Sequence, residues 1–153
     1  MSSSLLVGTS CASTENTMTL SNHAINKRSA NTLVLPPFFS RPTDDDGIVD
    51  FYQQFVRRLR TNAQNIVLYH FPETAGDELS VDAIQRLVTT FPNASAGLQD
   101  SSGNLISTFT FINAYPDLAI HWRRPPALAG IGIWRAWHHH DYSKFVPQRS
   151  PGY

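Results

Sequence analysis

Four short apolar runs recur along the chain, and a polar segment with helical spacing follows each of them. The runs begin at Leu5, Thr32, Asn65 and Ala96. They are continuously apolar rather than alternating, which is typical of strands in a parallel sheet that is covered on both faces. The segments between them carry apolar residues three and four positions apart, as amphipathic helices do. The pattern therefore predicts four strand–helix repeats, with a further strand starting at Leu118.

Residues that cap helices and break strands support this division. Ser13 or Thr14 and Ser80 precede helical segments, and Thr43 precedes three aspartates that suit the positive end of a helix. Prolines at positions 36 and 72 end two of the strands. Alternating strands and helices predict an α/β protein. The natural candidate is a (β/α) barrel, and a doubly wound sheet is the alternative.

Composition narrows the classes of partner. The 153 residues are 41% hydrophobic, and twelve basic residues balance twelve acidic ones. We therefore expect no nucleic-acid or membrane partner, since both attract strongly basic proteins. No stretch approaches the roughly 20 apolar residues of a membrane span, and the first residues do not resemble a signal peptide. We expect a cytoplasmic protein without a cofactor.

A metal site is not expected either. Cys11 is the only cysteine, so it can form no internal disulfide and cannot hold a zinc ion alone. The three consecutive histidines at positions 138–140 could chelate a transition metal loosely. They have no carboxylate or cysteine partner at ligand spacing, so we predict no metal centre.

The segment after the fourth apolar run is the most informative in the chain. Gln99, Asp100, Ser101 and Ser102 lead to Gly103 and then to a new helical segment. Parallel α/β proteins place their chemistry at the carboxyl ends of strands, where such side chains would gather. Considered alone, such a segment is more commonly a polar turn with a helix cap.

Four short segments in order give the chain a family resemblance. They are residues 7–9, 35–39, 68–72 with Gly76, and 97–103. With them the chain resembles the dihydrodipicolinate synthase and N-acetylneuraminate lyase family of Schiff-base aldolases, which are (β/α)8 barrels. The resemblance begins at the third strand of the barrel. It implies a partial barrel over residues 1–120, with strands three to six and the start of strand seven.

The resemblance also implies catalytic positions. In this family a lysine at the end of the sixth strand attacks a 2-oxo acid such as pyruvate, and a tyrosine at the end of the fifth relays protons. Tyr69 falls on the tyrosine position and Gln99 on the lysine position. An amide nitrogen is not nucleophilic, because its lone pair is delocalised into the carbonyl. The two lysines of the chain, Lys27 and Lys144, lie in other segments.

Two other positions also lack a functional group that the family has. Phe39 stands where dihydrodipicolinate synthase has a tyrosine of its proton relay, and phenylalanine has no hydroxyl. Thr74 stands where that enzyme has an arginine for the substrate carboxylate. Together with Gly97, these are the predicted substrate-contacting positions. His70 follows Tyr69 directly, so it should point to the opposite face of the strand as a packing residue.

Three hypotheses of function remain open. The first is an aldolase by descent that is inactive because it lacks the nucleophile. The second is a non-catalytic binding module, either a homo-oligomer or a regulatory partner of a full-length paralogue. The third is a lyase with a lysine-independent mechanism, in which Gln99 orients a water or a carbonyl and Tyr69 acts as acid or base.

Residues 121–153 break the pattern. They contain tryptophans, prolines and the histidine run, without periodicity. Written as TGG CGA CGA, the codons of Trp122, Arg123 and Arg124 read Gly-Asp-Asp in the next frame, and the family's seventh strand ends with these residues. We therefore predict that this tail is translated out of frame.

Sequencing the transcript across codons 118–124 tests the frame prediction. We expect an inserted or missing base, with Gly-Asp-Asp encoded in the shifted frame. An uninterrupted message whose shifted frame lacks Gly-Asp-Asp would contradict it.

Overall fold

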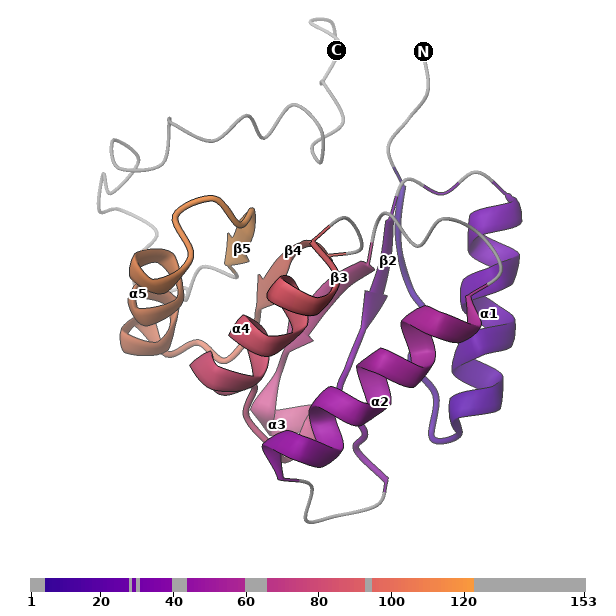
Figure 1. The fold of residues 1–153 in the computed structure, drawn as a ribbon, viewed down its shortest axis with the longest axis horizontal. Helices are drawn as coiled ribbons and strands as arrows, with labels where there is room; N and C mark the ends of the chain where they lie inside the picture. The colour runs from indigo at the N-terminus through magenta and orange to yellow at the C-terminus, as the bar shows by residue number, and fades with distance from the viewer. Residues whose placement is uncertain are drawn as a thin grey trace, which may run out of the picture.

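A computed structural model describes residues 5–27, 29, 31–39, 44–59, 66–92 and 95–122. Strands and helices alternate along this part of the chain (Figure 1). The strands are β1 (Leu6–Gly8), β2 (Asn31–Val34), β3 (Ile66–His70), β4 (Ser95–Asp100) and β5 (Ile120–Trp122). The helices are α1 (Thr14–Asn26), α2 (Asp45–Arg58), α3 (Pro72–Ala75), α4 (Val81–Thr90) and α5 (Leu105–Ala114).

The described strands form one sheet in the order β1-β2-β3-β4-β5, and every neighbouring pair is parallel. Strands that lie side by side in chain order are the arrangement of a (β/α) barrel. A doubly wound sheet reverses its strand order at one point, and this sheet does not. The order of the strands in the sheet therefore favours the barrel over the doubly wound alternative.

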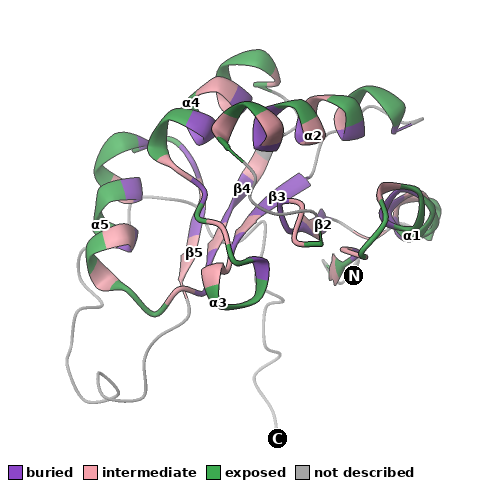
Figure 2. Ribbon diagram, turned by 90° about the horizontal axis from the view of Figure 1, so that it is seen from below, coloured by how far each residue is buried: buried purple, intermediate pink, exposed green. Residues whose placement is uncertain are grey.

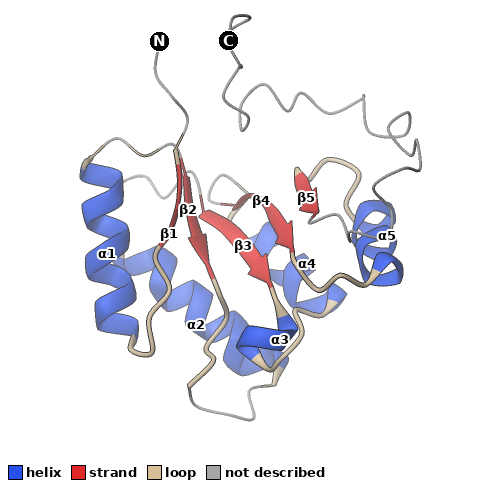
Figure 3. Ribbon diagram, turned by 180° about the vertical axis from the view of Figure 1, so that it is seen from behind, coloured by secondary structure: helices blue, strands red, loops and turns tan. Residues whose placement is uncertain are grey.

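Helices α1, α2, α4 and α5 gather on one side of the sheet. In Figure 2, α5, α4, α2 and α1 follow one another in an arc around the strands, and Figure 3 shows the strands from the other side with α2 and α4 behind them. We call the side covered by α2 and α4 the helix face and the opposite side the inner face. In a complete barrel the inner face lines the interior.

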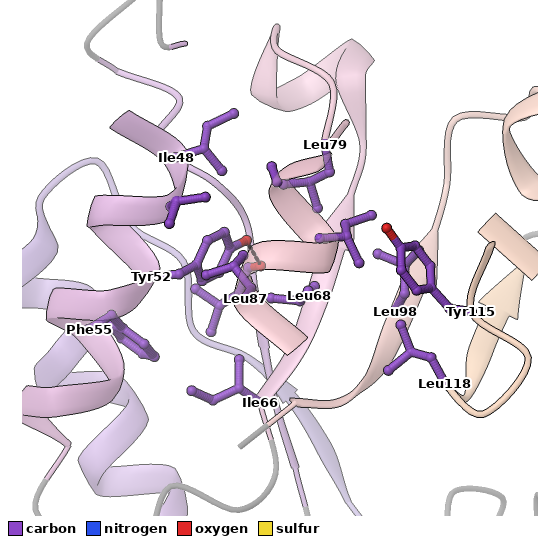
Figure 4. Close-up of a cluster of buried hydrophobic side chains, with 14 of the residues drawn as sticks. Ile48, Tyr52, Phe55, Ile66, Leu68, Leu79, Leu87, Leu98, Tyr115 and Leu118 are labelled. Carbon is purple, nitrogen blue, oxygen red and sulfur yellow. Dashed lines mark hydrogen bonds between the residues drawn. The ribbon is translucent and has the colours of Figure 1, made fainter. Parts of the chain in front are cut away.

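Alternate residues of the strands supply the helix face. Leu68 and Leu98 are register partners on β3 and β4 and both are buried. They belong to a cluster that α2 and α4 complete with Tyr52, Phe55 and other apolar side chains (Figure 4). The cluster consists of Met18, Val34, Ile48, Val49, Tyr52, Phe55, Leu59, Ile66, Leu68, Leu79, Ala83, Ile84, Leu87, Leu98, Phe111, Tyr115, Leu118 and Ile120.

One polar contact inside this cluster fixes α2 on the sheet. The hydroxyl of Tyr52 donates a hydrogen bond of 2.7 Å to the carbonyl oxygen of Val34. Burial raises the pKa of this phenol far above its ordinary value, so it stays protonated as a donor.

The predicted caps are largely confirmed. Ser13 accepts from the amide of Asn16 and Ser80 from that of Ala83. The cap of α2 is Asp44, whose carboxylate accepts from the amide of Gly47 at 2.8 Å, whereas Thr43 lies outside the described residues.

Helix α3 was not predicted, because the segment was assigned to a loop that Gly76 closes. Pro72 occupies its first turn, and Gly76 ends it in the left-handed conformation with φ 78°. These are sequence signals for the start and the end of a helix.

Strands β4 and β5 approach closely at Gly97. The amide of Leu98 donates a hydrogen bond of 2.8 Å to the carbonyl of Ala119. A Cβ atom at Gly97 would lie 2.5 Å from that carbonyl oxygen. A side chain at this position would therefore push the two strands apart.

We expect Gly97→Ala to lower the free energy of unfolding by about 1–3 kcal/mol, because β5 must shift to admit the methyl group. Gly8→Ala is the matched control on β1, since no heavy atom lies within 4 Å of its added Cβ. It should change stability by about 0.5 kcal/mol or less. Urea unfolding of both variants measures the difference, and equal stabilities would contradict the close approach.

Candidate functional site

Tyr69 and Gln99 lie side by side at the carboxyl ends of two neighbouring strands. They are register partners in the β3–β4 pair. Their neighbours Leu68 and Leu98 face the helices, so Tyr69 and Gln99 project from the inner face. Both side chains are half-buried. The two residues that the resemblance assigns to catalytic positions are thus neighbours on the face that lines a barrel interior.

His121 extends this pair to a row of three. It is the register partner of Gln99 in the β4–β5 pair, so its side chain shares the inner face. We call Tyr69, Gln99 and His121 the inner row. Burial lowers the pKa of His121, which favours the neutral imidazole.

His121 was not among the predicted site residues, because it falls in the segment assigned to the irregular tail. The described strand continues to Trp122, two residues beyond the predicted boundary at 120, while residues 123–153 lie outside the described part. The apolar run from Leu118 to Ile120 is the sequence signal for this strand, and extending the strand beyond the run would have included His121.

Gln99 offers hydrogen bonds and no nucleophile. Its amide nitrogen donates to the hydroxyl oxygen of Ser101 at 3.5 Å, a long contact. The amide of Ser101 in turn donates to the carbonyl of His70 at 2.8 Å, which continues the β3–β4 pairing past the end of β4. On the neighbouring strand, the ring of Tyr69 lies 5.5 Å from that of Phe71. Gln99 and Tyr69 together can bind and orient a carbonyl or a carboxylate, and the Tyr69 hydroxyl can donate a proton.

Asp100 lies on the helix face and fixes the loop that joins β4 to α5. It is completely buried. Its carboxylate accepts from the amide of Ser102 at 2.9 Å and from the hydroxyls of Ser102 at 2.7 Å and Thr108 at 2.5 Å. Asn104 then caps α5 by accepting from the amide of Ile106. The sequence predicts a polar turn at Asp100, but its hydrogen bond with Thr108 of α5 was not predicted.

His70 is a packing residue, as predicted. Its ring packs edge-on against Phe111 of α5 with centroids 5.1 Å apart, and its Nδ1 accepts from the amide of Leu79 at 3.1 Å. Burial lowers its pKa, while the charges of Asp100 and Glu78 oppose the shift. The neutral ring faces the helices, away from Tyr69.

The three predicted substrate-contacting positions occupy different surroundings. Gly97 lies on the inner face two residues before Gln99 and is buried. Phe39 follows β2 with 76% of its surface exposed, and Thr74 is exposed on α3. Only Gly97 is thus placed on the same face as the inner row, and contact of these positions with a substrate stays a prediction.

Within the described residues, no group of three or more histidine, cysteine or acidic side chains could hold a metal ion. The histidines at 138–140 lie outside that part of the chain. None of the described helices is long and apolar enough to cross a membrane.

Comparisons with known proteins agree on one family. The model of the dihydrodipicolinate synthetase family matches residues 2–122. The chain is 32% identical over 117 residues to an uncharacterized DapA-like lyase of Chloroflexus aurantiacus, which covers 76% of this chain and 39% of that protein. It is 23% identical over 116 residues to the 4-hydroxy-tetrahydrodipicolinate synthase of a Hydrogenobaculum species, covering 76% and 38%. The chain therefore spans about two fifths of the length of these relatives.

Solved structures give the same result. Dihydrodipicolinate synthase from Agrobacterium tumefaciens superposes with a TM-score of 0.73 and 30% identity, over 76% of this chain and 41% of that one. A catalytic lysine mutant of the sialic acid aldolase from Ruminococcus gnavus has a TM-score of 0.64 at 19% identity, over 72% and 35%. The second likeness shows the fold alone.

We expect Asp100→Ala to lower the free energy of unfolding by about 2–4 kcal/mol, because the buried Thr108 hydroxyl and two half-buried donors of Ser102 lose their acceptor. Asp100→Asn keeps an acceptor oxygen and most of the volume, so it should be clearly less harmful. Chemical denaturation of the two variants tests this. The expected role of Asp100 is wrong if both variants unfold at the same denaturant concentration as the unmodified chain.

Proposed function

Because the chain belongs to the dihydrodipicolinate synthetase family, we propose that its inner face binds a small 2-oxo acid such as pyruvate without forming an imine. The observation that carries this proposal is the register pair of Tyr69 and Gln99 at the carboxyl ends of β3 and β4. By the family resemblance, Gln99 takes the place of the Schiff-base lysine and Tyr69 that of the proton-relaying tyrosine.

The amide of Gln99 replaces covalent capture with hydrogen bonding. Its nitrogen can donate to the ligand's carbonyl oxygen, and Tyr69 can donate from the neighbouring strand. No described strand contains a lysine, and neither do the described segments that follow their carboxyl ends, at residues 9–13, 35–39, 71–80 and 101–104. Lys27 caps the C-terminus of α1, and Lys144 lies outside the described residues.

Loss of the imine removes the step on which aldol chemistry of this type depends. A protonated imine accepts the electron pair released when the carbon–carbon bond breaks, and a hydrogen-bonded ketone does so far less well. We therefore infer that this chain is a binding module descended from a lyase, inactive in Schiff-base aldol cleavage. The activity named for the relatives belongs to proteins more than twice as long.

Borohydride trapping with pyruvate tests the absence of the imine. The mass of the unmodified chain should stay unchanged. Gln99→Lys places an amino group beside Tyr69, so it should gain the mass of a reduced pyruvyl adduct. Gln99→Arg is the matched control, because it adds a similar side chain with a cation that forms no such adduct.

Two outcomes count against the proposal. A trapped adduct on the unmodified chain would show that another amine forms the imine. Ligand-observed NMR with pyruvate gives the second readout, since transfer of saturation to the methyl signal reports binding without reaction. Absence of that signal in the unmodified chain would overturn the binding role.

A further inference from the structure

His70 is a buried titratable side chain that the proposed binding role does not use. It ends β3, and 2% of its surface is exposed. Its Nδ1 accepts a hydrogen bond of 3.1 Å from the amide of Leu79. An imidazole nitrogen that accepts carries no hydrogen, so the neutral ring is the tautomer with its proton on Nε2. That nitrogen is buried, and no described group accepts from it.

This hydrogen bond closes the segment that joins β3 to α4. The segment runs over residues 71–80 and includes α3, which lies at the carboxyl end of β3 (Figure 3). The amide of Gly76 donates to the carbonyl of Pro72 within α3. The amide of Leu79 instead donates to the side chain of the strand, and the leucine itself is buried. The contact between His70 and Leu79 therefore holds the end of the segment against the end of β3.

A second proton on the ring is incompatible with this contact. The proton would bind Nδ1, and two N–H groups would then face each other where one hydrogen bond now exists. The imidazolium would also be a buried cation whose Nε2 has no acceptor among the described residues. The proton and the closed segment therefore exclude each other.

The carboxylates nearest to the ring do not supply that acceptor. Asp100 is the register partner of His70 on β4, and its oxygens accept from Ser102 and Thr108. Glu78 lies in the segment and is exposed. The charges of the two carboxylates oppose the effect of burial, but burial is the larger effect and lowers the pKa of His70.

The other elements around the ring bring no further charge to it. Helix α5, which supplies Phe111, carries no titratable side chain. On α4, Asp82 and Arg86 pair with each other at the surface. Glu73 and Asp77 lie in the segment, and neither they nor the α4 pair contribute to the pKa of the imidazole. The ring is thus the proton-sensitive group of this contact.

We propose that His70 and the amide of Leu79 form an acid-sensitive latch, which holds residues 71–80 on the sheet while the ring is neutral and releases them when the ring takes up a proton. Phe71 begins this segment, and its ring lies 5.5 Å from that of Tyr69. Release therefore removes a neighbour of the inner row. The inference concerns the fold beside the site, so it stands whether or not the inner face binds a 2-oxo acid.

The sign of the pH dependence follows from the two states of the segment. In the released state the ring is in water and has the ordinary histidine pKa of about 6.5, whereas in the closed state burial lowers the pKa. The released state therefore binds more protons below about pH 6.5, and the closed state is fully stable only above that pH. Below it, the equilibrium constant for release should rise by up to about tenfold per pH unit, until the pKa of the closed state is reached.

Hydrogen exchange of the Leu79 amide, followed by NMR on the full chain from pH 8 to pH 5, measures this release. The protection factor of Leu79 should be constant above about pH 7 and fall by up to about tenfold per unit below about pH 6.5. The amide of Phe55, buried inside α2, reports unfolding of the whole chain and should keep its protection. The nitrogen shifts of the His70 ring at pH 8 should show a bare Nδ1 and a protonated Nε2.

His70→Asn is the matched variant, because its amide oxygen can accept from Leu79 and its side chain takes up no proton in this range. Protection of Leu79 in this variant should not change between pH 8 and pH 5. His23→Asn removes an exposed histidine of α1 and should keep the pH dependence of the unmodified chain. If His70→Asn does not fold, exchange and ring shifts of the unmodified chain still decide, because neither requires a variant.

Three results would overturn the latch. The first is protection of Leu79 that stays constant from pH 8 to pH 5 in the unmodified chain. The second is loss of protection at Phe55 in step with Leu79, which would show that the ring stabilises the whole fold rather than the segment. The third is the same fall in His70→Asn, which would assign the effect to another titrating group.

Discussion

Parallel pairing of neighbouring strands is the constraint on which both the core and the candidate site depend. Register partners in such a sheet share a face, and the carboxyl ends of the strands meet at one edge. Leu68, Leu98 and Ile120 therefore enter the apolar cluster beneath the helices. The residues that follow them, Tyr69, Gln99 and His121, form the inner row by the same registers. A one-residue slip of any strand would exchange the two sets, so burial of the core also protects the site.

The end of β4 serves both faces of the sheet. Gln99 projects from the inner face, and Asp100 binds the β4–α5 loop and Thr108 on the helix face. Ser101 follows Asp100. Its amide donates to the carbonyl of His70, and its hydroxyl oxygen accepts from the amide of Gln99. A buried carboxylate is stable only when donors surround it, and the loop supplies them. The polar cluster on the helix face thus begins at the residue directly after the one that supplies the amide of the inner row.

The sequence predicted what depends on local patterns. Continuous apolar runs marked the strands, Ser13 and Ser80 marked helix starts, and the resemblance brought Tyr69 and Gln99 to one strand edge. It did not predict what depends on pairing between distant segments. Asp100 looked like a turn residue because its partner Thr108 lies on the next helix. His121 looked like part of the tail because only pairing with β4 extends the strand past Ile120.

The sequential strand order also bears on how the chain acquires its structure during synthesis. Each new strand pairs with the strand made just before it, so every described pairing joins segments separated by a single helical connection or by α3 and α4 together. Low contact order of this kind reduces the entropy lost in closing each loop. A chain emerging from the ribosome can therefore add one strand and helix at a time, because none of the described strands lies between two earlier ones.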